Sequence, residues 1–175
     1  ADRGLDTNNA RVEQREAVTL YVVKEPVITA TGIDNGGPAT VDWQIRFTFE
    51  DGPLDCEAVA VDAAAQRVFL LSKRGFTPVL YELALQATDQ NSVAVAHRLT
   101  EVPHFNWPTA MDISPDGLRA VVLSYGHAYE YGRAPDEDWK QALARPGRRI
   151  LMPARRQGES ICFGDDGRTV YLTSE

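Results

Sequence analysis

The chain has 175 residues, of which 43% are hydrophobic and 25% charged, a composition typical of a folded globular domain and not of a disordered chain. The formal net charge is -7, which makes nucleic acid an unsuitable partner because its phosphates would be repelled. No window holds 18 consecutive apolar residues, so no transmembrane helix is predicted. Two cysteines are too few for a disulfide framework.

The first 40 residues predict one strand and a turn-rich segment. Residues 18 to 23 (Val-Thr-Leu-Tyr-Val-Val) are β-branched and aromatic, Pro26 closes them, and Gly36-Gly37-Pro38 marks a turn. The opening Ala1-Asp2-Arg3 is not a charged region followed by an apolar one, so no signal peptide is present in this chain. Either a leader has been removed or the chain is part of a longer protein.

The rest of the chain alternates short apolar runs with turn residues. Residues 41 to 49 place apolar side chains at every second position, which predicts a half-buried strand, and Gly52-Pro53 ends it. Further strands are expected at residues 58–61, 68–72, 79–85, 93–99, 110–114, 120–124, 127–131, 150–153, 160–163 and 170–173. A short helix is expected at residues 136–144, with Asp136, Glu137 and Asp138 in its first turn. This spacing indicates an all-β sandwich, barrel or propeller.

An internal repeat favours the propeller. Residues 56–62, 108–114 and 158–164 align without gaps, and each is followed by a tight turn. An arginine after each turn (Arg67, Arg119 and Arg168) opens an apolar strand that ends in Ser or Thr. The copies lie about 50 residues apart, the length of a propeller blade. A β-sandwich with similar hairpins by chance is the alternative.

The predicted blade parts are residues 1–40, 41–85, 93–131 and 150–175 of a single propeller-like domain. About three four-stranded blades result, fewer than the 4–8 that close a ring. The chain is therefore a fragment of a propeller, or half of a six-bladed ring completed by a second copy, or its edges are covered in another way. A homodimer is the preferred interpretation because exposed sheet edges are avoided.

Two sets of motifs resemble a family of bacterial β-propeller proteins that are mostly uncharacterised and often exported. The first is Asp55-Cys56-Glu57-Ala58-Val59-Ala60-Val61-Asp62 with Leu71-Ser72-Lys73, similar to the family's D-x-E-[AS]-[ILV]-A-x-D and V-[ST]-K patterns. The second is Gly158-Glu159-Ser160-Ile161 with Tyr171-Leu172-Thr173-Ser174-Glu175, similar to G-E-[AS]-I…Y-x-T-S-E. More distantly, the chain resembles esterase-like phytase propellers. The resemblance implies a propeller fold and favours a periplasmic or secreted location.

The aligned repeat also marks candidate site residues at the channel face. Glu57, Thr109 and Glu159 share one repeat position at the start of the innermost strand, and Asp55 lies on the same strand face as Glu57. Converging carboxylates suit Ca²⁺, with Asp55, Glu57 and Glu159 as ligands, or acid–base chemistry. Alternatively, each Glu accepts backbone hydrogen bonds or pairs with Lys73 or Arg74. The full channel-face set is Asp55, Glu57, Lys73, Thr109, Asp112 and Glu159.

Other polar residues carry weaker signals. His97, His104 and His127 lack metal-ligand spacing, although His104 and His127 could supply a base or ligand if they reach the channel mouth. Cys56 and Cys162 are expected to be buried free thiols.

A basic stretch interrupts the acidic chain between residues 145 and 156. It is either a solvated loop that pairs with the acidic residues 136–138 or a site for an anion or an acidic partner. Its members are Arg145, Arg148, Arg149, Arg155 and Arg156.

The leading functional hypothesis is a binding or scaffolding module that uses its channel face. The alternative is a metal-dependent ester or phosphoester hydrolase in which Glu57 and Glu159 hold the metal or act as acid and base. No G-x-S-x-G motif, phosphate-binding loop or dinucleotide fingerprint is present. The sequence defines neither the ligand nor whether the chain is an enzyme.

Overall fold

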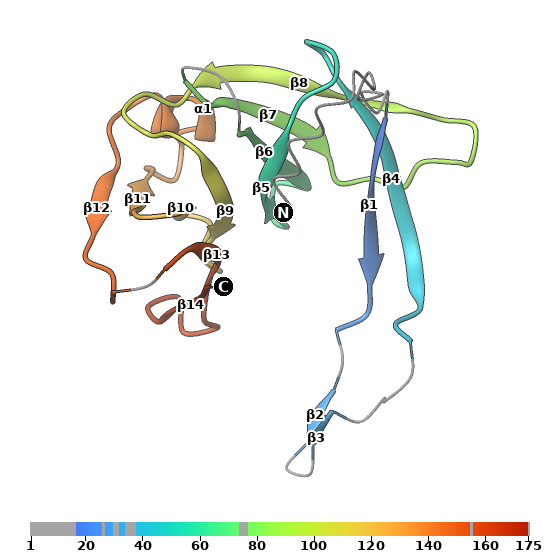
Figure 1. The fold of residues 1–175 in the computed structure, drawn as a ribbon. Helices are drawn as coiled ribbons and strands as arrows, with labels where there is room; N and C mark the ends of the chain where they lie inside the picture. The colour runs from blue at the N-terminus through green and yellow to red at the C-terminus, as the bar shows by residue number, and fades with distance from the viewer. Residues whose placement is uncertain are drawn as a thin grey trace, which may run out of the picture.

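The computed structural model describes residues 17–25, 27–29, 32–33, 38–73, 77–154 and 156–174. These residues form an all-β structure with one short helix (Figure 1). The strands are β1 (Val18–Val23), β2 (Ile28–Thr29), β3 (Gly32–Ile33), β4 (Val41–Phe49), β5 (Cys56–Asp62), β6 (Arg67–Ser72), β7 (Val79–Ala84), β8 (Ala94–Glu101), β9 (Pro108–Ile113), β10 (Arg119–Ser124), β11 (Ala128–Gly132), β12 (Arg148–Ile150), β13 (Gly158–Phe163) and β14 (Val170–Ser174). All-β architecture is therefore confirmed. Among these residues, no helix is long and apolar enough to cross a membrane.

Strands that follow one another in sequence pair as antiparallel neighbours. β5, β6, β7 and β8 form one meander, β9 to β12 form a second, and β13 pairs with β14. The first strands of these three units, β5, β9 and β13, lie side by side (Figure 1). Curled sheets arranged in this way are compatible with part of a propeller.

Apolar side chains fill the space between successive sheets. Ala58 and Leu71 of the first meander pack with Met111 and Val122 of the second in one buried cluster. Val121 and Ile161 belong to another buried cluster, which joins the second meander to β13 and β14. Because β6 and β10 sit in the middle of their sheets, both of their faces are buried. The core is thus a stack of sheets packed face to face.

The place of β4 differs from the expected grouping of residues 41–85 into one blade. β4 pairs in parallel with β8, with Phe47 opposite Ala94, and antiparallel with β1, with Ile45 opposite Leu20. The four-stranded units therefore span residues 56–101 and 108–150, and the groupings 41–85 and 93–131 are corrected. The physical reason is burial: Phe47 packs against apolar side chains of β6 and β7, covering the second face of that meander.

The helix α1 (Trp139–Leu143) is shorter than the expected 136–144. Asp138 is its N-cap and accepts a hydrogen bond from the Gln141 amide at 2.7 Å, while the Gln141 side chain accepts one from the Asp138 amide. This capping box places the acidic residues before the first turn and not within it, which corrects that prediction. Buried Trp139 and Leu143 anchor the helix in the core between the meanders.

The turns after β9 and β13 obey the expected chemistry. Gly117 and Gly167 adopt φ of 69° and 62°, which suits glycine, whereas Gln66 takes a φ of 55° in the turn after β5. Only two of the three arginines expected after these turns, Arg67 and Arg119, lie at equivalent positions of the repeat. The Ser114 amide donates to the Arg119 carbonyl, and the Gly164 amide donates to the Thr169 carbonyl, each at 2.8 Å. Because Ser114 and Gly164 are equivalent in the repeat, the equivalent of Arg119 is Thr169 and not Arg168.

Candidate functional site

The strands β5, β9 and β13 each have a β-bulge near their first residue. On β5 the register shifts between Cys56 and Ala58, so Glu57 is an extra residue without a partner on β6. On β9 the same shift leaves Thr109 extra, and on β13 it leaves Glu159 extra. β-Bulges turn a side chain away from its regular direction and are common beside binding sites. The repeat position marked by sequence is therefore a structural position as well.

Because β5, β9 and β13 are adjacent, their starts lie at one end of the stacked sheets. The ends of β6 and β10 reach the same place, since each pairs antiparallel with the strand before it. We call this surface the strand-start face. Its residues are Asp55, Glu57, Lys73, Thr109, Tyr125, Gln157 and Glu159.

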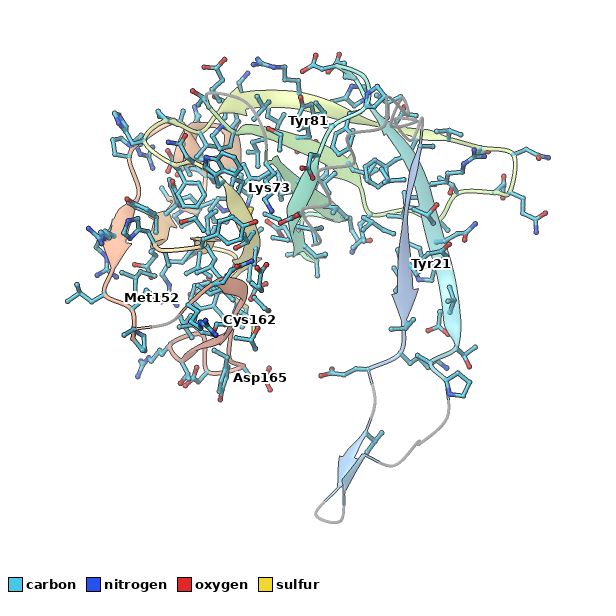
Figure 2. All side chains as sticks on the ribbon, in the orientation of Figure 1. Tyr21, Lys73, Tyr81, Met152, Cys162 and Asp165 are labelled. Atoms are coloured by element: carbon cyan, nitrogen blue, oxygen red, sulfur yellow. The ribbon has the colours of Figure 1, made fainter. Side chains whose placement is uncertain are left out.

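Lys73 is the cationic residue of the strand-start face, and it is buried. Its side chain is 7% exposed, and its ammonium forms a salt bridge with Glu57 and donates to the Tyr125 hydroxyl at 2.6 Å. Burial alone would lower the pKa of Lys73, but the hydrogen bonds to Glu57 and Tyr125 outweigh it and raise the pKa above its usual value. Figure 2 shows Lys73 inside the molecule. Pairing of Glu57 with Lys73, one of the two alternatives for this carboxylate, is confirmed.

Thr109 and Tyr125 connect the second meander to β13. The Thr109 hydroxyl donates to the Gly158 carbonyl at 2.9 Å, and the Gly158 amide donates to the Tyr125 carbonyl at 3.1 Å. Thr109 is buried, so its hydroxyl holds the strand starts together and does not reach solvent.

The remaining candidate residues make local hydrogen bonds. Asp112 accepts a hydrogen bond from the Phe163 amide at 2.7 Å and so joins β9 to β13. Glu159 accepts one from the Gln157 side chain, and the Asp55 carbonyl accepts one from the Lys73 amide at 2.7 Å. Within the described part of the chain, no group of three or more His, Cys, Asp or Glu side chains is placed to hold a metal ion. The calcium site on Asp55, Glu57 and Glu159 therefore stays a prediction.

Tyr125 is a member of the face that the sequence patterns missed. It follows Ser124 just as Lys73 follows Ser72, and these two serines end the equivalent strands β10 and β6. Extending the repeat by one residue would have found it.

The histidines and cysteines are scattered. His97 is exposed beside Glu50, and His127 contacts Arg149. Burial raises the pKa of the Cys56 thiol to about 12, which makes it a poor nucleophile, whereas Cys162 is exposed, contrary to expectation. Arg74 and Arg155 lie outside the described residues.

Comparison with known proteins adds no assignment: no protein-family model matches the sequence, and no curated protein shows significant similarity to it. What the strand-start face offers is chemical. Carboxylates, one ammonium and one phenol provide hydrogen-bond donors and acceptors held by strand ends and bulges, which are fixed positions suited to recognition of a polar ligand.

Proposed function

We propose that this chain is a propeller-type binding module that holds a polar ligand on its strand-start face. The observation that carries the proposal is the recurrence of one bulge, at Glu57, Thr109 and Glu159, on three adjacent strands. A repeated irregularity at one end of the sheets concentrates polar side chains there. The opposite ends of the same strands carry ordinary turns.

The electrostatics of the face support a binding role more than a catalytic one. Glu57 is held in a salt bridge with Lys73, and the raised pKa of Lys73 keeps its ammonium charged at neutral pH, so this ammonium is not a proton acceptor there. A metal-dependent ester or phosphoester hydrolase that uses Glu57 and Glu159 remains the alternative prediction. If Asp55, Glu57 and Glu159 bind a metal ion, calcium is the candidate.

The assembly proposal is a second copy that completes the ring. Val59 and Val61, on the outer face of β5, are 39% and 45% exposed, and Tyr171 at the other end of the stack is 60% exposed. Exposed apolar side chains on the first and last sheets of the stack favour a second copy packing against each of them. Sedimentation should give a dimer at micromolar concentration, and a clean monomer would contradict this part of the proposal.

Amide chemical shifts test the binding role. Ca²⁺, glucose, glycerol 3-phosphate and 4-nitrophenyl phosphate are titrated separately into ¹⁵N-labelled protein. We expect at least one probe to shift the amides of Glu57, Thr109 and Glu159 saturably. Glu159→Gln should weaken the binding of that probe, whereas the control Glu101→Gln, at an exposed residue of β8, should not. Shifts confined to the opposite turns, or no saturable shift from any probe, would contradict the proposal.

The same samples separate binding from hydrolysis. The binding module should leave 4-nitrophenyl phosphate and 4-nitrophenyl acetate intact. Release of nitrophenol that Glu57→Gln abolishes would replace the binding role with the hydrolase.

A further inference from the structure

The arginines between residues 145 and 149 divide into paired and unpaired side chains. Arg145 forms a salt bridge with Glu137, and Arg148 forms one with Glu130. Among the described residues, the Arg149 guanidinium has no carboxylate partner, and its one hydrogen-bonding contact is with the ring of His127. The interpretation of the basic stretch as a solvated loop that pairs with acidic residues therefore fits Arg145 and Arg148 but not Arg149.

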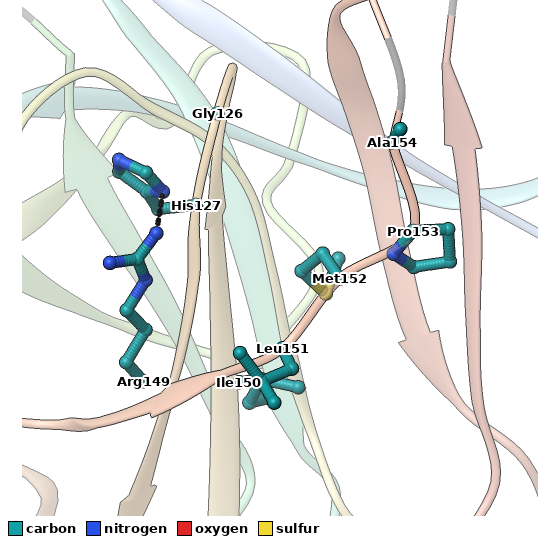
Figure 3. Close-up of a pocket in the computed structure, with 8 residues that line it drawn as sticks. All are labelled: Gly126, His127, Arg149, Ile150, Leu151, Met152, Pro153 and Ala154. Atoms are coloured by element: carbon teal, nitrogen blue, oxygen red, sulfur yellow. Dashed lines mark hydrogen bonds between the residues drawn. The ribbon is translucent and has the colours of Figure 1, made fainter.

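The contact with His127 leaves most of the Arg149 guanidinium available. One guanidinium nitrogen, Nη2, lies 3.0 Å from His127 Nδ1 (Figure 3). Since arginine only donates, a hydrogen bond here has Nδ1 of His127 as its acceptor. A guanidinium has five N–H donors, so this contact positions the group without satisfying it.

The same two side chains line a pocket of about 240 Å³. The turn at Gly126 forms part of its wall, and the chain that leads from β12 towards β13 forms the rest, with Ile150, Met152 and Pro153 as apolar members. Figure 3 shows Met152 and Pro153 following Ile150 along that segment. A pocket of this size suits a molecule smaller than a typical drug.

We propose that this pocket binds a small organic oxyanion, a carboxylate or a phosphate monoester that carries an apolar group. The oxyanion takes the free N–H groups of Arg149, for which bidentate pairing is the preferred geometry, and the apolar group lies against Met152 and Pro153. The neighbouring arginines strengthen this inference: Arg145 and Arg148 are neutralised by Glu137 and Glu130, whereas Arg149 has no carboxylate partner among the described residues. The proposal concerns a site separate from the strand-start face and does not depend on the function proposed there.

Three probes test the site on the whole chain: benzoate, phenyl phosphate and inorganic phosphate. We expect benzoate or phenyl phosphate to shift the amides of Gly126, His127 and Met152 saturably, and inorganic phosphate to bind at least fivefold more weakly than phenyl phosphate. The two organic probes distinguish a carboxylate from a phosphate ligand. Equal affinity for phenyl phosphate and inorganic phosphate would overturn the apolar part of the proposal.

Two matched variants test the role of Arg149. Arg149→Gln should weaken the organic anion at least tenfold, whereas Arg148→Gln, which removes the same charge from the neighbouring residue of β12, should leave its affinity within twofold. Both side chains are exposed, so both variants should keep the unfolding midpoint of the parent chain. Equal weakening by the two variants would show a general charge effect and overturn the site, as would the absence of saturable shifts at millimolar concentrations.

Discussion

The Lys73 ammonium lies 2.6 Å from the hydroxyl oxygen of Tyr125 and 4.8 Å from the centre of its ring, although the two residues are 52 positions apart in sequence. Lys73 follows β6 of the first meander, and Tyr125 follows β10 of the second. Together with Glu57, they form a polar connection between two sheets whose other contacts are largely apolar.

The Lys73–Glu57 pair predicts unequal effects for its two partners. Glu57→Gln leaves a buried ammonium without its counter-charge and should lower the free energy of unfolding by about 2–4 kcal/mol. Lys73→Met leaves a carboxylate that is 35% exposed and still hydrated, so we expect a smaller loss of about 1–2 kcal/mol. Urea unfolding measures both values, and a larger loss for Lys73→Met would contradict the burial of this ammonium.

A second connection between the meanders is centred on Asp62, which is buried. Its carboxylate accepts hydrogen bonds from Arg133 at 3.1 Å, from the Trp139 indole at 3.3 Å and from the Ala65 amide at 2.9 Å. Asp62→Ala leaves these donors unpaired and should cost about 3–5 kcal/mol of unfolding free energy. The control Asp136→Ala, at an exposed turn residue, should change it by less than about 0.5 kcal/mol. Similar losses in both variants would show that Asp62 is not the buried acceptor described.

Gly147 predicts a steric effect. A Cβ at this position would lie 2.7 Å from the Tyr131 ring, which is buried, so Gly147→Ala should destabilise the chain by about 1–3 kcal/mol. Gly132→Ala is the matched control because its Cβ would meet nothing within 4 Å. Thermal unfolding compares the two variants, and an unchanged midpoint for Gly147→Ala would rule out this close approach.

Alkaline pH should weaken the fold. Burial raises the pKa of Tyr131, and burial together with the hydrogen bond to Asp51 raises that of Tyr81, above the ordinary value of 10.0. The unfolded chain then loses these protons before the folded chain does, so stability is complete below pH 10 and falls as pH rises above it. Each tyrosine contributes a slope of at most about 1.4 kcal/mol per pH unit.

Unfolding free energies measured between pH 8 and 11.5 check this dependence. Tyr131→Phe keeps the ring but removes one titrating group, and it should therefore flatten the slope above pH 10. An equal slope in parent and variant would contradict a raised pKa at Tyr131.

Most strands were predictable because their signals are local, but β2 and β3 were not expected, and β12 lies at Arg148–Ile150 where residues 150–153 were expected. Alternation and turn residues placed β1 and β4 at their observed bounds, and the repeat placed Glu57, Thr109 and Glu159 at equivalent positions. The sheet order was not predictable in full, because the parallel pairing of β4 with β8 joins Phe47 to Ala94 and depends on long-range burial that no local pattern records.

The candidate site was predictable only in outline. Repeat position identified the strand starts, but it gave no information on which groups neutralise one another. Lys73 satisfies Glu57, and Gln157 contacts Glu159. Lys73 follows the strand that pairs with the strand of Glu57, and Gln157 lies two residues before Glu159, so these pairings depend on side-chain conformations that no repeat pattern records.

The apposition of the strand starts is the basis of the proposed binding face, and nuclear Overhauser contacts measure it directly. The Thr109 side-chain protons and the Gly158 α-protons should give cross-peaks, because the Thr109 hydroxyl oxygen lies 2.9 Å from the Gly158 carbonyl oxygen. We expect these cross-peaks together with contacts between the Lys73 side chain and the Tyr125 ring. Complete β9–β10 and β13–β14 pairing contacts without any Thr109–Gly158 cross-peak would contradict it.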